Sequence, residues 1–316
     1  MDKNKLASVI LMAMTLGACG GSSDSDSVVD AGGTAPGNGT GVTTPAPVES
    51  LEGSTARRVK GAPESDLAAV SNGNSKFAFD MYHSLTSESD ENLIVSPHSM
   101  STAFAMLYAG ADGNTATELK NTFHYELDSE QLHQGFNSID QLIEESNSDD
   151  GIKVSVINSQ WGEITYDFNP DYSNVLSEFY GADIKITDIA GAPEETRTLV
   201  NDWVAEQTND LIKNLMPENS INTDTRLVLV NAVYFNGKWK SPFPADNTAD
   251  RDYTLLDGNV TQVSTMTYRH NFNVFSNGNE TLVELPYKGE AFSMYVMHTP
   301  VTQFSDMESG LSTVKF

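Results

Sequence analysis

The sequence predicts an α+β domain in which helical segments come first and strand-like segments follow. Three observations support this prediction. Apolar residues recur at helical spacing in segments between residues 77 and 143. Runs that alternate apolar and polar residues, as half-buried strands do, become frequent later and dominate after residue 226. The two kinds of segment do not alternate regularly along the chain, which argues against a doubly wound α/β fold.

The helical segments follow one another in the first two thirds of the chain. Residues 77–85 and 100–111 each place their apolar side chains on one helical face. Ser96 is a natural N-cap for the second segment, and Pro97 fits its first helical position. Thr115 with Glu118 has the form of a capping box for a third helix. Further helices are expected over residues 132–143, from Asn169 to Tyr180 and over residues 199–215.

The strand-like segments are expected at residues 152–156, 183–189, 226–239 and 292–299. Residues 226–239, RLVLVNAVYFNGKW, are apolar on both faces, which is typical of a strand in the middle of a sheet. Asp257-Gly258 and Asn277-Gly278 are turn dipeptides and predict hairpins among the last strands.

Composition excludes several classes of function. The chain of 316 residues carries 44 acidic and 18 basic side chains, a formal charge of −26. Nucleic acid is therefore not an expected partner, because phosphate binding needs a basic face. One Cys excludes an intramolecular disulfide and a Cys-rich zinc site, and the six His show no metal-ligand spacing. No cofactor motif is found, and no G-x-S-x-G, HExxH or phosphate-binding loop supports an enzyme.

The N-terminus is interpreted as a signal peptide followed by a tether. Lys3 and Lys5 precede an apolar stretch that is too short to span a bilayer. The next residues, Leu-Gly-Ala-Cys, resemble the bacterial lipoprotein box, which implies residues 1–18 as a lipoprotein signal peptide and Cys19 as the lipid attachment site. Gly20 after the Cys favours the outer membrane within this pattern. The alternative is an ordinary secretory signal with an incidental Cys.

Residues 19–70 are expected to form a flexible linker. Gly, Ser, Thr, Pro and Asp dominate here, and no aromatic residue occurs before Phe77. Such a segment cannot bury enough apolar surface to offset its ordering entropy. The folded domain is therefore expected over residues 71–316.

Three stretches of this domain resemble the serpin family of serine protease inhibitors. They are NLIVSPHSMSTAFAMLYAGADGNT (92–115), VNDWVAEQTNDLIKNLMPENSINTDTRLVLVNAVYFNGKWKSPF (200–243) and ELPYKGEAFSMYVMHT (284–299). The resemblance implies the serpin fold, with a main mixed sheet, barrel-like sheets and packed helices. It also implies a single-use covalent trap for a serine protease, with a cysteine protease as a second option. A reactive loop is attacked and then inserts into the main sheet as an added strand.

The resemblance also assigns roles to particular positions. Ser96, Ser99 and Asn231 match the shutter region, whose hydrogen bonds hold the central strands until the loop inserts. For these residues a helix cap, or ordinary satisfied polar groups, is the alternative. Trp239 matches the aromatic residue at the breach, where the loop first enters, and core packing is its alternative role. Residues 228–236 match the strand that would pair with the inserted loop.

The serpin pattern continues beyond the point where this sequence stops. The expectation is therefore a serpin domain that is incomplete at its C-terminus and has no reactive bond in residues 1–316. The full-length protein would be a monomeric inhibitor at the bacterial cell envelope, bound to the membrane by its lipid alone and facing the periplasm or the exterior. Two alternatives remain open: a non-inhibitory serpin-like surface lipoprotein that binds or carries a ligand, and a non-functional fragment.

Overall fold

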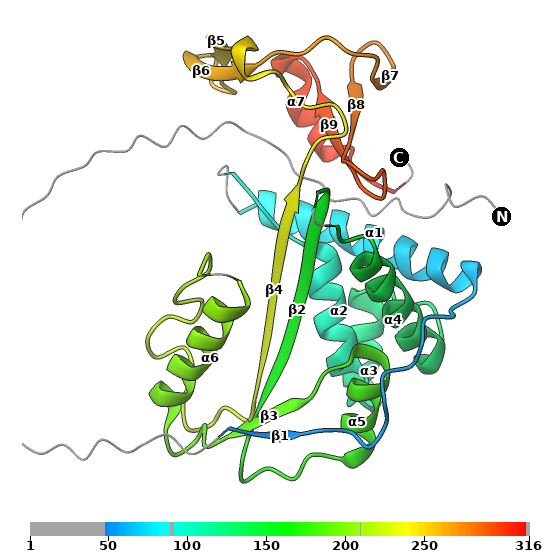
Figure 1. Cartoon of the computed structure of the whole chain (residues 1–316), viewed down its shortest axis with the longest axis vertical. Coiled ribbons are helices and arrows are strands. Elements are labelled where there is room, and N and C mark those ends of the chain that lie inside the picture. The colour runs from blue at the N-terminus through cyan, green and yellow to red at the C-terminus, as the bar shows by residue number, and fades with distance from the viewer. Residues whose placement is uncertain (1–47, 89–91, 149, 209, 314–316) are drawn as a thin grey trace, which may run out of the picture.

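The computed structural model describes residues 48–88, 92–148, 150–208 and 210–313. The helices are α1 (Glu64–Thr86), α2 (Pro97–Tyr108), α3 (Gly113–Thr122), α4 (Ser129–Glu145), α5 (Pro170–Val175) with its π-helical continuation η2 (Leu176–Tyr180), α6 (Pro193–Gln207) and α7 (Phe304–Ser309). The strands are β1 (Glu49–Leu51), β2 (Ile152–Glu163), β3 (Ile184–Thr187), β4 (Leu227–Gly237), β5 (Thr248–Thr254), β6 (Val260–Met266), β7 (Asn273–Ser276), β8 (Thr281–Pro286) and β9 (Ser293–His298). Helices precede most strands, so the predicted α+β class is confirmed (Figure 1).

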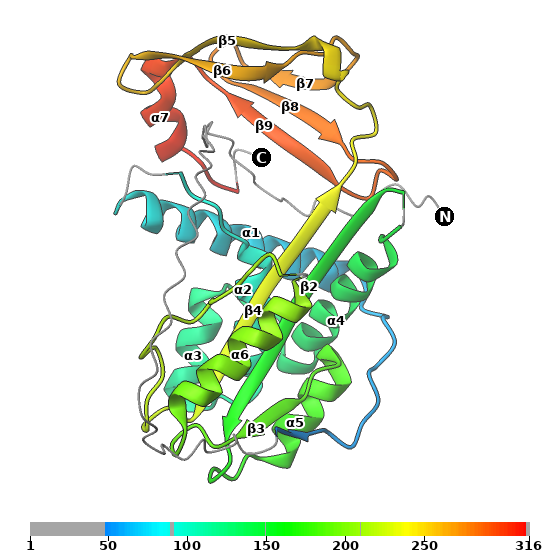
Figure 2. The ribbon, with the colours of Figure 1, turned by 60° about the vertical axis from the view of Figure 1, so that its left-hand side comes forward.

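We call β1 to β4 with α1 to α6 the larger lobe, and β5 to β9 with α7 the smaller lobe (Figure 1). A four-stranded sheet in the order β1-β3-β2-β4 forms the centre of the larger lobe. β2 and β4 are antiparallel and pair from Ile152 opposite Gly237 to Gly162 opposite Leu227. β3 runs parallel to the end of β2, and β1 adds antiparallel to β3. Helices α1 to α5 lie on one side of the long strands and α6 on the other, as Figure 1 shows, and in the turned view of Figure 2 α6 lies in front of these strands.

The expected position of residues 226–239 in the middle of a sheet is wrong for the described part of the chain. β4 is the last strand of its sheet there and pairs only with β2. Its two-sided apolar pattern has another cause, because both of its faces are covered. Val230 packs with Val200 and Val204 of α6 on one face, and α2 lies against the other. Apolar residues on both faces of a strand therefore indicate that other elements pack against both faces. They do not indicate whether both backbone edges of the strand are hydrogen-bonded to neighbouring strands.

Two local helix predictions are corrected by the structure. Asp112, and not Thr115, is the N-cap of α3, and its carboxylate accepts from the Gly113 amide at 2.7 Å. Gly113 has φ +58°, a backbone conformation that a side chain disfavours, so the helix begins there and the apparent capping box lies within it. The helix expected over residues 199–215 ends at Gln207, and Leu211 and Leu215 are exposed.

The other helices and the hairpins agree with the sequence. The helices expected over residues 77–85, 100–111 and 132–143 correspond to α1, α2 and α4, and their apolar faces meet in one core cluster. The predicted helix from Asn169 to Tyr180 is α5 and η2, and the Asn169 side chain caps it. Gly258 and Gly278 have φ of +84° and +94°, the conformation that the two hairpin turns require.

The start of the domain differs from the expected linker. Helix α1 begins at Glu64, and residues 49–62 follow the surface of the larger lobe before it. This segment starts as β1 on the edge of the sheet and then makes hydrogen bonds to α5, η2 and α4. Cys19, the expected signal peptide and the rest of the expected linker up to residue 47 lie outside the described residues. Within the described part of the chain, no helix has the length and apolar character needed to cross a membrane.

His133 generates a prediction about pH. It is 2% exposed in α4, its Nδ1 lies 2.7 Å from the Tyr180 hydroxyl, and burial lowers its pKa to about 4. The unfolded chain therefore binds a proton below about pH 6.5 that the folded protein excludes until about pH 4. This contribution to stability is complete above pH 6.5 and decreases as the pH falls toward 4.

We expect His133→Asn to remove most of this dependence, because an Asn keeps a polar atom near Nδ1 and does not titrate. Between pH 7 and pH 5 the free energy of unfolding should fall by about 2 kcal/mol less in the variant than in the wild type. Urea unfolding at the two pH values measures the difference. Equal falls in both proteins would contradict a buried neutral His133.

Candidate functional site

A polar contact lies between α2 and the middle of the β2–β4 pair. Ser99, in the first turn of α2, is fully buried, and its hydroxyl donates to Asn231 Oδ1 on β4. The Asn231 amide returns a hydrogen bond to the Ser99 carbonyl at 3.2 Å and donates to Asn158 Oδ1 on β2 at 2.6 Å. One helix and two strands are thus joined through a single asparagine amide whose donors and acceptor are all used.

The position of this contact follows from the strand register. Asn158 and Asn231 are directly opposite each other in the β2–β4 pair. Ser99 is fully buried and the two asparagines are partly buried, and polar groups in such a place are costly unless they find partners. The contact therefore fixes both the register of the strands and the distance of α2 from them. Any separation of α2 from β4 would leave Asn231 with unpaired groups.

The structure brings together two of the three residues predicted for the shutter. Ser99 and Asn231 are in contact, whereas Ser96 does not belong to this cluster. Ser96 occupies the N-cap position of α2 with extended backbone, and Pro97 is the first helical residue, as predicted. The Ser96 side chain makes no cap hydrogen bond, so that part of the expectation is wrong. Its carbonyl accepts from the Met100 amide at 3.2 Å.

Asn158 is the member of the cluster that the sequence did not indicate. It lies near the middle of β2, beyond the residues 152–156 expected to form that strand. The alternation of apolar and polar residues in this strand ends at Val156, before Asn158, so no local pattern marked this residue. Identifying it as a partner of Asn231 requires the pairing register of two strands that lie far apart in the sequence.

Trp239, predicted for the breach, lies just after β4, where the chain passes into the smaller lobe. It forms an isolated β-bridge with Tyr287, and the two rings stack with centroids 4.5 Å apart. Gly237 permits this approach, because a Cβ there would lie 2.7 Å from the Tyr287 ring. A cavity of about 210 Å³ opens beside Trp239, between it and Phe272. Trp239 is thus a packing residue at the junction of the lobes, and its position does not bring it to the Ser99 cluster.

Ion pairs surround the same junction. Asp150, just before β2, pairs with Lys238 at 2.7 Å and also with Lys288. The hydrogen bond from Lys238, together with that from Lys288 and both positive charges, lowers the pKa of Asp150 to about 2. Lys240 pairs with Glu290 at 2.7 Å. The end of β4 is therefore tied to the β8–β9 connection by charges at the surface as well as by the stacked rings.

Chemistry by a nucleophile or a metal finds little support in the described residues. Ser241 Oγ lies 3.2 Å from His270 Nε2, but the contact is open to solvent, and the described contacts include no carboxylate that orients the ring. A nucleophilic serine needs both a base and a group that orients that base. No group of three or more His, Cys, Asp or Glu in the described segments could hold a metal ion.

Comparison with known proteins identifies the family. Residues 72–316 match the family described as Serpin (serine protease inhibitor). An uncharacterised serpin-like protein of Methanosarcina acetivorans is 34% identical over 247 residues, which are 78% of this chain and 57% of that protein. The leukocyte elastase inhibitor of Bos taurus is 33% identical over 252 residues, 79% of this chain and 65% of that protein.

A solved structure gives the same result for the fold. Emu (Dromaius novaehollandiae) ovalbumin superposes with a TM-score of 0.72 and 27% identity, over 78% of this chain and 68% of that one. The chain spans about three fifths of the length of the relatives it matches. The resemblance seen in the three sequence stretches is thus confirmed, and this chain belongs to the serpin family and has the serpin fold.

Proposed function

We propose that the whole protein is a protease inhibitor that traps a serine protease once, by insertion of a reactive loop into the main sheet. It is not proposed to be an enzyme. The observation that supports the proposal most directly is the contact of Ser99 with Asn231 and Asn158. It joins α2 to the central strands at the positions where the resemblance implies a shutter. A relative that is 33% identical is named leukocyte elastase inhibitor, and this gives independent support.

The proposed reaction begins as ordinary proteolysis. The protease serine attacks a loop carbonyl, the peptide bond breaks, the amine leaves with a proton from the protease histidine, and an acyl-enzyme ester remains. The cut loop then adds to the sheet before water hydrolyses the ester. Among the described residues, β4 pairs only with β2, so the other backbone edge of Leu227–Gly237 has no partner strand there and could accept an added strand. Both faces of β4 are already covered, so the added strand would extend an existing core.

The proposed location is the bacterial cell envelope, with the protein held at the outer membrane through a lipid on Cys19. The sequence pattern around Cys19 supports this location. The charge of −26 supports attachment by lipid alone, because anionic headgroups would repel the polypeptide.

The trapping proposal predicts a covalent product. Protein purified from its native cells, with its intact mass recorded first, is incubated with trypsin-like, chymotrypsin-like and elastase-like serine proteases. We expect a complex that survives SDS with at least one of them, because the acyl ester is not hydrolysed. An active-site-blocked protease is the control and should give no complex. Cleavage without any complex would contradict the trap and favour a binding or carrier protein.

The anchor generates a second prediction. Cys19→Ala should move the protein from the membrane fraction to the soluble fraction of native cells, because no acyl chain can be attached. Immunoblotting of the separated fractions measures the shift. Continued membrane association of the variant would refute the lipid anchor and leave the inhibitory proposal untouched.

The shutter generates a third prediction. Ser99→Phe should lower the melting temperature and promote polymers, because the site has no space for a ring and α2 must move away from β4. Ser99→Ala should cost about 1–3 kcal/mol, because it leaves Asn231 Oδ1 without its donor. Ser96→Ala is the matched control and should change stability by less than about 0.5 kcal/mol, since its side chain makes no cap bond. Ser99→Phe that remained monomeric with an unchanged melting temperature would contradict the assignment.

A further inference from the structure

The segment that precedes α1 is attached to the domain in an unusual way. We define residues 49–62 as the strap. None of its residues is buried, and its large apolar side chains, Leu51 and Val59, are exposed. Apolar burial therefore contributes little to holding it in place. Its position must depend on hydrogen bonds and charges.

The strap first extends the sheet. Its residues 49–51 form β1 and pair with β3, Leu51 opposite Ile184. Gly53 then donates its amide to Ser177 Oγ at 2.8 Å, and Ser54 donates to Asn174 Oδ1 at 2.9 Å. The chain is so close to α5 here that a Cβ on Gly53 would lie 2.4 Å from the Ser173 carbonyl oxygen.

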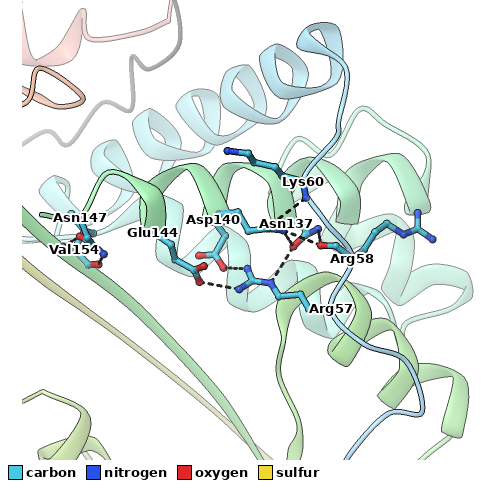
Figure 3. A network of polar contacts seen from close by, with 9 residues as sticks. Arg57, Arg58, Lys60, Asn137, Asp140, Glu144, Asn147 and Val154 are labelled. Atoms are coloured by element: carbon cyan, nitrogen blue, oxygen red, sulfur yellow. Dashed lines mark hydrogen bonds and ion pairs between the residues drawn. The ribbon is translucent and has the colours of Figure 1, made fainter. Parts of the chain in front are cut away.

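The next contacts of the strap are ionic and are made with α4 (Figure 3). The Arg57 guanidinium donates to Glu144 at 2.9 Å, to the buried amide of Asn137 at 3.2 Å and to Asp140. Desolvation opposes its charge, but the hydrogen bonds and charges of Glu144 and Asp140 raise the pKa of Arg57 overall. Burial raises the pKa of Asp140 despite this arginine, so the carboxylate depends on the strap for compensation.

Two further cations complete the contact. Arg58 pairs with Glu130 at 2.9 Å and with Glu178 of η2, and its guanidinium lies 4.7 Å above the ring of Phe179. Lys60 pairs with Glu145. The backbone is bound as well, because Asn137 and Gln141 both donate to the Arg58 carbonyl, at 2.8 and 3.0 Å.

The strap supplies positive charge to a surface with an excess of carboxylates. It brings three cations to five carboxylates, those of Glu130, Asp140, Glu144, Glu145 and Glu178, within a chain of net charge −26. Release of the strap would leave these carboxylates without their cationic partners, and Asp140 and Glu144, one helical turn apart on α4, would then repel each other. Most of the charged groups are partly solvated, so salt weakens their attraction far more than it weakens the apolar core.

We propose that residues 49–62 are a salt-sensitive latch that fastens the β3 edge of the main sheet to α5, η2 and α4. The latch is closed when the three cations are paired and opens without loss of the core when they are screened. Its closed state restricts movement of β3 relative to α4, because the strap is bonded to both. The proposal is independent of protease trapping, since it concerns only contacts within residues 48–187.

Amide hydrogen exchange on the full-length protein tests the latch, because the strap's own amides are bonded: Arg58 to the Glu178 carbonyl, and Gly61 and Ala62 to Ser138 Oγ. Exchange is measured from about 0.01 M to about 1 M salt, over which the Debye length falls from about 30 Å to about 3 Å. We expect residues 49–62 and β3 to exchange about tenfold faster at high salt, with the β2–β4 centre unchanged. No change in the strap, or an equal change in β2 and β4, would overturn the proposal.

Variants separate charge from shape. Arg57→Glu with Arg58→Glu should speed exchange in the strap at low salt and reverse its salt dependence, because salt would now screen repulsion between the new glutamates and the carboxylates of α4 and η2. Gly53→Ala should loosen β1 by steric contact with the Ser173 carbonyl while salt dependence at Arg58 persists. Lys76→Ala, which breaks the similarly exposed Lys76–Glu126 pair elsewhere on the surface, is the matched control and should leave the strap unchanged.

If the double variant does not fold, Arg58→Ala together with the wild-type salt series decides. Salt dependence retained in Arg58→Ala at the wild-type level would contradict the latch.

Discussion

The pairing of β2 with β4 is the constraint on which the rest of the larger lobe depends. Its register sets Asn158 opposite Asn231 and so creates the one place where Ser99 can join both strands. The same pairing carries the chain out of the sheet at Gly237, where Trp239 can stack on Tyr287. A shift by one residue would turn Asn231 to the other face and Val230 toward α2. The polar contact and the junction of the lobes therefore both depend on this register.

Periodicity predicted most of the helices and the hairpins, because those patterns are local, but it extended α6 beyond its end at Gln207. Leu132 and Phe136 share a buried face in α4, as their spacing requires. The position of β4 in its sheet was not predictable in this way, because a side-chain pattern reports which faces are covered and not which backbone edges are paired. The resemblance to serpins placed Ser99 and Asn231 correctly as neighbours, whereas Asn158 needed the three-dimensional register.

The strap could not be inferred from composition. Its residues are as polar as those of a linker, and polar composition predicts disorder only when no specific partners exist. Here the partners lie far away in sequence: Arg57 meets Asp140, and Gly53 meets Ser177. Such contacts leave no local pattern. An arginine pair at positions 57 and 58, in a chain with an excess of 26 negative charges, was the available signal.

The order of the strap's contacts along the chain has a mechanical consequence. Residues 49–51 hold β3, residues 53–55 hold α5 and η2, and residues 57–62 hold mainly α4. A pull on residue 48 therefore loads these contacts in series, and they peel one after another, starting with β1. Complete peeling would release about 50 Å of extended chain before any force reached α1. Under tension applied at residue 48, the strap would therefore lengthen first, and the helices of the domain would bear the force only after its contacts had broken.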